Sequence, residues 1–344
     1  MKKLFSMCVA VAMTGMVSAQ ESNWLNLQGE VRVDYRREYL DGDAVKSNSG
    51  FKGKYVNYQL SGDITDAFSY SYRQRLNKAH EDQSFFDATD WAYLTYQPNA
   101  RWSISAGKQV VSMGGYEYDR APIDLYFCSE YWNNVPCYRL GASVAYTTRS
   151  GRDKFQAQVC ESPFDLKDED MYACNLIWYG SHGWFNTIYS ANALEYLPGK
   201  FIYYLALGHE LKFGKLKWQL DFMNRATTQH AFFFKDCSLV SEWSCLIGKH
   251  VNLFGKVTYD VNRSGREADY CVYNGTELTR VGGGVEYYPL AGGNRNIRLH
   301  ANFCYAWGTN TNEAGTLLPK QSIVDIGLTW KVDIFSFPRK KSAL

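Results

Sequence analysis

The residues best suited to chemistry here are charged side chains of opposite sign. One group lies in the long segment between Gly107 and Gly141, which holds the acids Glu117, Asp119, Asp124 and Glu130 and the bases Arg120 and Arg139. A second group is basic and lies on the polar faces of two alternating segments, at Arg32, Arg36, Arg73 and Arg75. Acidic and basic groups that face each other across water create a transverse field, which favours polar solutes and sets ion selectivity. The alternative is that the arginines pair with the carboxylates and hold the segment down, and both roles are compatible.

Other chemistries find little support in the sequence. Neither G-x-S-x-G nor a Ser/His pair on neighbouring strands stands out, so no nucleophile with its base is indicated. The run from Gly282 to Glu286 is explained better by a bend in a strand than by phosphate binding. The six histidines lie far apart and no CxxC occurs, which argues against zinc. We therefore expect no enzyme, no cofactor and no metal.

Eight cysteines follow residue 20, at positions 128, 137, 160, 174, 237, 245, 271 and 304. An even number in an exported chain is consistent with disulfides, and three neighbouring pairs (128/137, 160/174 and 237/245) suggest staples within loops. The alternative is that they are free thiols that act as small buried hydrophobic residues. The sequence leaves both open.

The segment from 107 to 141 is too long for an ordinary hairpin. Alternating strands flank it, from Trp102 to Ala106 and from Ala142 to Tyr146. A connection of about thirty residues between two strands is usually functional or disordered. Its aromatic residues, prolines and cysteines argue against disorder. An ordered loop of this size needs a surface to pack on, which predicts the inside wall of a wide β-barrel.

The first strand shows the pattern that repeats along the chain. One face carries Leu25, Leu27, Val31, Val33 and Tyr35, and the other carries Asn26, Gln28, Glu30, Arg32, Asp34 and Arg36. A period of two with this sorting means that one face meets an apolar environment and the other meets water. In a membrane barrel the apolar face meets lipid and the charged face lines the lumen.

Sixteen such strands are predicted, near 25–36, 51–62, 68–76, 91–96, 102–109, 140–149, 154–161, 172–180, 184–191, 200–213, 215–225, 238–247, 251–261, 277–289, 296–307 and 322–335. Long connections follow the odd strands and short turns follow the even ones. Outer-membrane barrels have an even strand number, short periplasmic turns and longer outer loops. The fold class expected is therefore all-β, a transmembrane antiparallel barrel with its third loop folded inward. The count stays open by one strand around 226–250.

The start of the chain has the features of an export signal. Residues 1–19 have a basic start, an apolar run and a small-residue cleavage site, and are predicted to be a cleaved signal peptide. Residues 20–337 are expected to form one barrel domain without a plug, and 338–344 a short basic periplasmic tail. Without Lys2 and Lys3 the 37 Lys and Arg fall to 35, equal to the 35 Asp and Glu, so nothing points to nucleic acid.

Several strand-like pieces carry a family resemblance. Gly107-Lys-Gln109 with its long loop, Trp91 to Tyr96, Phe254 to Arg263 and the terminal strand resemble the phosphate-selective porin O and P family, in the branch found in Bacteroidetes-type bacteria. The resemblance implies a sixteen-stranded barrel, usually a homotrimer, that sits in outer-membrane lipid and passes small hydrophilic solutes or inorganic anions. It also implies a basic ladder at the constriction, and Arg32, Arg73, Arg75 and Lys108 are the residues that match such a role.

The expectation is thus a passive diffusion channel in the outer membrane. Its first rival is a closed barrel that serves as a scaffold or adhesin of a surface complex, which the aromatic loops (Phe232 to Phe234, Tyr126 and Trp132) would suit. A second rival is a membrane-embedded hydrolase. If the arginines set the field, neutralising Arg73 and Arg75 together shifts the reversal potential toward cations. The solute, the open state and the oligomeric state are left open.

Overall fold

A computed structural model describes residues 23–77, 85–164, 169–229, 234–290, 294–312 and 318–339. The predicted signal peptide, 1–19, lies outside the described residues, as do all but two residues of the predicted tail. Phe232 and Phe233 also lie outside them.

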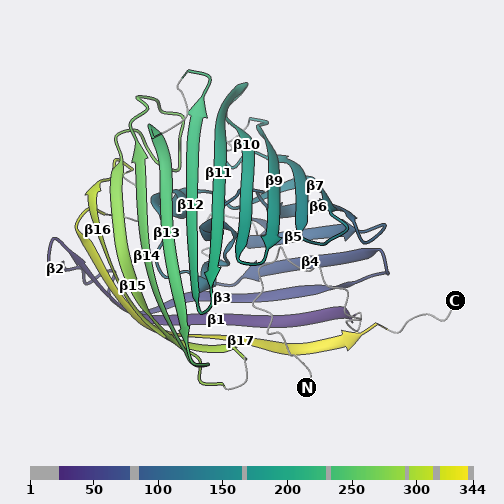
Figure 1. The fold of residues 1–344 in the computed structure, drawn as a ribbon, viewed down its shortest axis with the longest axis horizontal. Coiled ribbons are helices and arrows are strands. Elements are labelled where there is room, and N and C mark those ends of the chain that lie inside the picture. The colour runs from purple at the N-terminus through teal and green to yellow at the C-terminus, as the bar shows by residue number, and fades with distance from the viewer. Residues whose placement is uncertain are drawn as a thin grey trace.

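Within the described chain, sixteen long strands form one closed antiparallel barrel (Figure 1). They are β1 (Asn23–Leu40), β3 (Gly50–Asp63), β4 (Phe68–Arg75), β5 (Thr89–Tyr96), β6 (Trp102–Val110), β7 (Tyr138–Thr147), β8 (Asp153–Glu161), β9 (Tyr172–His182), β10 (Phe185–Leu197), β11 (Lys200–Phe213), β12 (Leu216–Thr227), β13 (Asp236–Ile247), β14 (Val251–Asn262), β15 (Glu277–Tyr287), β16 (Ile297–Thr309) and β17 (Gln321–Pro338). Each strand pairs with the next along the chain, and β17 closes the ring on β1 in a register that runs from Asn23–Pro338 to Leu40–Gln321. The predicted fold class is confirmed.

The remaining elements are small. A two-residue strand, β2 (Asp43–Ala44), extends the β1–β3 connection. The helical pieces are α1 (Phe85–Ala88), α2 (Tyr116–Asp119), the 3-10 turn η1 (Pro122–Asp124) and α3 (Glu130–Asn134). In the described residues, no helix has the length and apolar character needed to cross a membrane.

The alternation seen in the sequence separates two environments. In β9, Ala173, Asn175 and Ile177 point inward and are buried, whereas Tyr172 and Leu176 are more than half exposed on the outside. Exposed apolar side chains of this kind lie on strands all round the barrel, among them Phe155, Phe303 and Ile326. A belt of outward apolar residues around a polar interior is the arrangement of an outer-membrane barrel.

The connections differ from the expected alternation at one place. β10 and β11 were expected to be joined by a longer connection after residue 191, but a two-residue turn, Pro198-Gly199, joins them, with Gly199 in the left-handed region at φ 71°. β10 extends to Leu197 because the side chains of residues 192–197 also alternate between the two faces, and the inward residue Leu194 is fully buried. Around 226–250 the described chain forms the end of β12 and the whole of β13, and β14 begins at Val251, so the number of strands there is the expected one.

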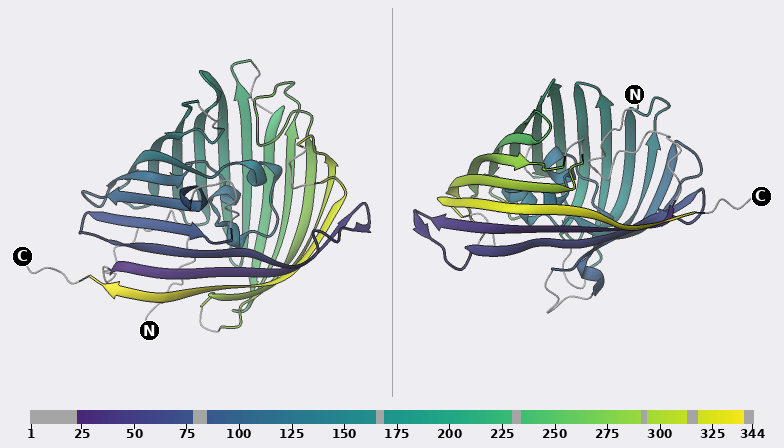
Figure 2. Two further views of the ribbon diagram at one scale, coloured as in Figure 1. Left: turned by 180° about the vertical axis from the view of Figure 1, so that it is seen from behind. Right: turned by 90° about the horizontal axis from the view of Figure 1, so that it is seen from below.

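A hydrophobic core lies inside the barrel, toward the end that carries the long loops. The β6–β7 connection contributes Val111, Met113, Tyr118, Tyr131 and Val135 to it. Inward strand residues, the β8–β9 connection and the β14–β15 connection supply the other members, which include Phe164, Met171, Tyr204, Cys271 and Val272. The third loop therefore folds inward and packs on the wall, as predicted, and Figure 2 (left) shows its helices within the ring of strands.

A buried ion cluster ties the β14–β15 connection to the wall. Arg225 on β12 is fully buried, and its Nε lies 2.8 Å from Asp236 Oδ1 and 2.6 Å from Asp269 Oδ2. Asp269 also accepts a hydrogen bond from the backbone N–H of Cys271 at 2.8 Å. Removing one partner of such a buried pair is strongly destabilising, so this cluster fixes the connection in place.

All eight cysteines after residue 20 are free thiols in the structure. Five of them are buried, and Cys160 and Cys271 belong to the interior core. The structure therefore shows no staple between these cysteines, and five of the eight fit the alternative of a small buried hydrophobic residue, whereas Cys137, Cys174 and Cys245 are partly or fully exposed.

Candidate functional site

The β6–β7 connection, residues 111–137 and here called loop 3, is held by two aspartates of the wall. Asp221 on β12 accepts hydrogen bonds from the N–H groups of Tyr116 and Glu117, both at 2.8 Å. Asp260 on β14 accepts from the N–H of Glu130 at 2.8 Å. These N–H groups open α2 and α3 and have no partner within their helices, so each carboxylate satisfies donors that would otherwise be orphaned.

A buried lysine joins loop 3 to the wall between these two points. Lys256 on β14 is 3% exposed, and its Nζ lies 2.7 Å from Glu117 Oε1 and 3.5 Å from Glu242 Oε2. It also donates to the carbonyl of Phe127 at 3.0 Å. Glu117 in turn accepts from the Ser129 backbone N–H at 3.0 Å, which brings α2 and α3 together.

The middle of loop 3 is held by β1, β16 and β17. Arg32 Nη1 donates to the carbonyl of Leu125 at 2.5 Å. Asp124 lies 3.0 Å from Arg298 Nη2 and 3.1 Å from Lys331 Nζ. Burial alone would raise the pKa of Asp124, but the two cations outweigh it and lower the pKa below its usual value. This carboxylate is therefore charged, and it anchors the loop across the barrel.

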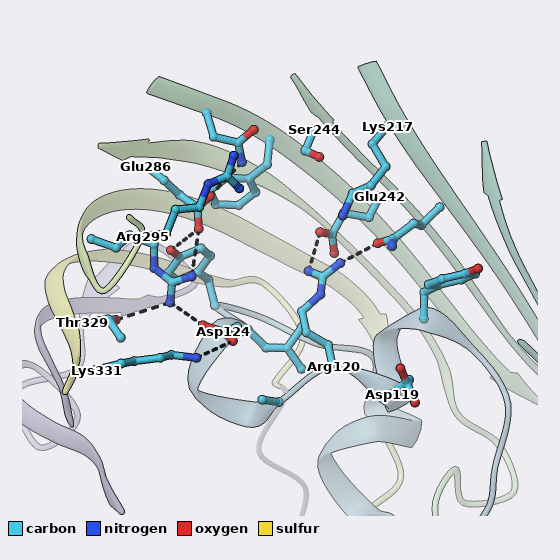
Figure 3. Close-up of a pocket in the computed structure, with 18 of the residues that line it drawn as sticks. Asp119, Arg120, Asp124, Lys217, Glu242, Ser244, Glu286, Arg295, Thr329 and Lys331 are labelled. Carbon is cyan, nitrogen blue, oxygen red and sulfur yellow. Dashed lines mark hydrogen bonds and ion pairs between the residues drawn. The ribbon is translucent and has the colours of Figure 1, made fainter. Parts of the chain in front are cut away.

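Loop 3 bounds a cavity of about 920 Å³ inside the barrel (Figure 3). The cavity extends to the end with the short turns, where Lys215, Leu246 and the stretch 294–296 line it. Seven acids and seven bases line it in all: Glu30, Asp119, Asp124, Glu210, Glu242, Glu286 and Asp333 against Arg120, Lys215, Lys217, Lys256, Arg295, Arg298 and Lys331. Because the signs balance, selectivity depends on which charges are already neutralised by partners.

The lining charges differ in how well they are paired. Arg120 Nη1 lies 2.5 Å from Glu242 Oε1, while its Nη2 donates to Gln219 at 2.5 Å (Figure 3). Lys217 reaches Glu210 only at 3.9 Å and its side chain is 41% exposed. Lys215 and Arg295 form no ion pair with any described residue, and Arg295 lies over the ring of Tyr288. The bases most available to a solute are therefore Lys215, Lys217 and Arg295.

The structure separates the residues that the sequence placed at the constriction. Asp119, Arg120 and Asp124 line the cavity, and Glu117 does not line it but is buried against the lining residue Lys256. The four arginines do not line the cavity, and each has a carboxylate partner: Arg32 with Asp34, Arg36 with Asp325, Arg73 with Asp90 and Glu30, and Arg75 with Asp90. Their proposed part in selectivity stays a prediction, and the structure favours the anchoring role.

Lys108 requires a correction. It pairs directly opposite Ala92 and Leu140, and residues opposite each other share a face of the sheet. Leu140 is 41% exposed on the outside, so Lys108 belongs to the outer face and not to the lumen. Its Nζ donates to the carbonyl of Phe86 in α1 at 2.9 Å. The alternation of Trp102, Ile104 and Ala106 already places residue 108 on the outer face. The family resemblance had instead implied a role for Lys108 at the constriction.

Sequence reasoning also missed lining residues. The main ones are Lys217, Glu242, Lys256, Glu286 and Arg298. All five lie at inward positions of alternating strands, so the period of two would have marked them as lumen residues. Nothing in the sequence, however, shows at which height along the strands loop 3 crosses the barrel. That height decides which of the inward residues line the cavity.

The charge of Asp119 gives a pH prediction. Burial raises the pKa of Asp119 to about 6, although Lys154 and Arg120 act to lower it. The carboxyl is therefore charged well above pH 6 and neutral well below it. Because Asp119 lines the cavity, we expect the reversal potential to shift toward anions as the pH falls through about 6. Measured in a salt gradient, the shift should be absent in Asp119→Asn, which should behave at all pH values like the wild type at low pH.

Comparison with known proteins agrees with this architecture. The model of the family described as phosphate-selective porin O and P matches residues 25–183. No curated protein matches the chain. Among solved structures, the trimer form of OmpT, an outer membrane protein of Vibrio cholerae, has a TM-score of 0.61 at 14% identity, covering 90% of this chain and 100% of its own.

Two further structures have a similar fold. The anion-selective porin from Comamonas acidovorans has a TM-score of 0.63 at 10% identity, with 90% of this chain and 99% of that chain covered. The outer membrane channel DcaP of Acinetobacter baumannii has a TM-score of 0.63 at 10% identity, with 90% and 97% covered. At these identities the likeness shows the fold. The chain has the fold of outer-membrane porins, and its residues 25–183 match the model of the phosphate-selective porin O and P family.

Proposed function

We propose that this protein is a porin, a channel for passive diffusion of small hydrophilic solutes across the outer membrane. The observation that carries the proposal is loop 3, which folds inside a closed barrel and bounds a charged cavity of about 920 Å³. A polar lumen within an apolar outer belt suits transfer of water-soluble molecules. The family match and the porin fold favour a channel over an enzyme, and no cofactor is needed for diffusion.

We further propose a preference for anions, including inorganic anions such as phosphate. The support is that, among the described lining charges with no ion pair closer than 3.9 Å, three are basic (Lys215, Lys217 and Arg295) and two are acidic (Asp119 and Asp333). Paired charges present little net field to a solute, whereas unpaired ones attract the opposite sign. The description of the matching family and the anion-selective porin from Comamonas acidovorans point in the same direction.

Planar-bilayer recording tests the channel directly. The purified full chain is expected to produce stepwise conductance, and reversal potentials in gradients of potassium chloride and potassium phosphate should show anion preference. Protein denatured before addition serves as the control. Absence of stepwise conductance at every pH and voltage would instead support a closed barrel that acts as a surface scaffold.

A homotrimer is the assembly we propose, with the wall from β4 to β6 facing the neighbouring copies. β4 and β5 have eight residues each, so they measure about 26 Å along the strand and about 19 Å in height at a tilt of 45°, less than the apolar band of about 25 Å. Lys108 adds a charge to this outer face, covered by α1, which projects outside the barrel (Figure 2, right). A neighbouring copy would shield a wall too short for lipid.

An exposed aromatic residue of α1 allows this interface to be tested. Phe86 is 44% exposed beside Lys108 on the outer face. We expect Phe86→Asp to convert the trimer to monomers in mild detergent, measured by native mass spectrometry, because a charge opposes burial between copies. Phe51→Asp, at an exposed site on β3, is the control that should remain trimeric. A wild type that is monomeric, or a Phe86→Asp trimer as stable as the wild type, contradicts this interface.

A further inference from the structure

One histidine lies where its charge could act on loop 3. Of the four histidines in the described chain, only His300 is buried, and its side chain is fully covered. It points into the barrel from β16, and its ring lies 4.6 Å from the ring of Tyr126 in loop 3. His182, His209 and His250 lie at short turns or on the outer face and do not touch this loop.

His300 and Asp34 meet across a glycine. His300 on β16 and Asp34 on β1 both pair opposite Gly327 of β17, the strand between them. Nε2 of His300 lies 3.1 Å from Asp34 Oδ1. A Cβ at Gly327 would lie 2.3 Å from Asp34 Oδ1 and 2.6 Å from His300 Nε2, so only glycine leaves room for this contact.

Asp34 connects the histidine to the anchor of loop 3. Its carboxylate is bound by Arg32, with Nη2 at 2.8 Å from Oδ2 and Nε at 3.1 Å from Oδ1. The same guanidinium donates through Nη1 to the carbonyl of Leu125, and it lies 4.8 Å from the centroid of the Tyr126 ring. His300, Asp34, Arg32 and loop 3 therefore form one continuous set of contacts.

A second carboxylate beside His300, that of Glu286, already has partners. From β1 it faces Asp34 and Arg32, from β15 the directly opposite Glu286, from loop 3 the phenol of Tyr126, and from its own strand Arg298, whereas β17 presents Gly327. Arg298 is itself paired with Asp124 and Glu286, and Tyr126 donates to Glu286. The next layer along the barrel is the closed pair Arg36–Asp325. A protonated His300 would thus compete with Arg32 for Asp34 in a low-dielectric site.

We propose that His300 is a pH sensor for loop 3, whose protonation loosens the contact of Arg32 with Leu125 and frees the middle of the loop. Histidine is the side chain that changes charge in the physiological pH range. The imidazolium draws an Asp34 oxygen toward itself and repels both Arg32 and Arg298. Those two arginines hold the stretch from Ile123 to Leu125, so the loop detaches from the β16–β17–β1 wall as the pH falls.

Hydrogen exchange of loop 3 in the intact protein in detergent tests the sensor. Corrected for intrinsic rates, exchange of 121–127 should be about tenfold faster at about pH 5 than at about pH 7.5 in the wild type, the equivalent of one pKa unit of coupling. His300→Gln cannot be charged and should show equal protection at both pH values, with His300→Asn as the second variant should the first not fold. His209→Gln on the outer face should keep the wild-type response.

Three results would overturn the proposal: equal protection of the wild type at both pH values, a response kept in His300→Gln or His300→Asn, or a response lost in Asp119→Asn. The last would assign the effect to the cavity carboxylate. The conductance readout rests on the proposed channel function, and there the wild type should show more frequent current fluctuations at low pH than His300→Gln. Loss of all conductance contradicts the channel, while hydrogen exchange still decides the sensor.

Discussion

Replacing Lys256 with methionine is expected to free loop 3 and to give a larger, noisier single-channel current. The substitution keeps an unbranched chain of similar length but removes the cation that joins Glu117 to Glu242 and the hydrogen bond to the Phe127 carbonyl. Breaking a buried pair by removing one partner costs about 3–5 kcal/mol, because the remaining charge keeps its desolvation penalty. The barrel should still assemble, since backbone pairing of β14 is not altered, but its unfolding midpoint in urea should fall.

The matched control is Lys200→Met, at an exposed position where β11 begins, which should leave conductance and unfolding unchanged. A Glu117→Gln/Lys256→Met double variant removes both charges of the closer pair. It should recover part of the lost stability but none of the loop attachment. If Lys256→Met matches the wild type in current noise and in unfolding midpoint, then loop 3 does not depend on this lysine.

Neutralising the weakly paired bases of the cavity is expected to have the largest effect on selectivity. In Lys215→Gln/Lys217→Gln the reversal potential should move toward cations, because these ammonium groups line the cavity and only Lys217 has a carboxylate nearby, at 3.9 Å. The change should weaken at high salt, where exposed charges are screened. Measurement is by reversal potential in a potassium chloride gradient at low and high ionic strength.

Arg73→Gln/Arg75→Gln is the informative comparison for that result. The sequence assigns these arginines to selectivity, whereas in the structure both bind Asp90 and neither lines the cavity. We expect a smaller shift of reversal potential than in the lysine variant, together with lower stability. A larger shift from the arginine pair would show that the permeation path runs along β4 and not through the cavity.

Much of the fold could be predicted from local pattern. The period of two in strands such as 25–36 fixes which side chains meet lipid, and the alternation of long and short connections fixes the even strand number. The inward path of loop 3 followed from its length and its aromatic residues. These features depend on neighbours in sequence, so a single sequence reveals them.

The pairing of charges inside the barrel could not be predicted in the same way. Arg36 meets Asp325 because β1 and β17 close the ring in one register, across nearly the whole chain. Asp34 reaches His300 only because Gly327 lies between them. Contacts of this kind depend on the stagger of distant strands, which no local pattern encodes.

The pairing of the cysteines could not be predicted from local sequence either. Neighbouring cysteines such as Cys160 and Cys174 looked like a staple, yet alternation places Cys160 inside and Cys174 outside. Cys128 and Cys271 instead pack as buried thiols of inward-folded loops. Whether two cysteines lie on the same face of the sheet was therefore a better guide to disulfide pairing than their spacing in the sequence.

Charge modification of a single cysteine during recording tests most directly that solutes pass through the cavity below loop 3. Ser244 lines this cavity (Figure 3), so Ser244→Cys treated with a negatively charged thiol reagent should lower the current stepwise and shift selectivity toward cations. The wild type and Ser150→Cys, at an exposed turn, should not respond to the same reagent. Full modification of Ser244→Cys, verified by mass, with an unchanged current would contradict passage through this cavity.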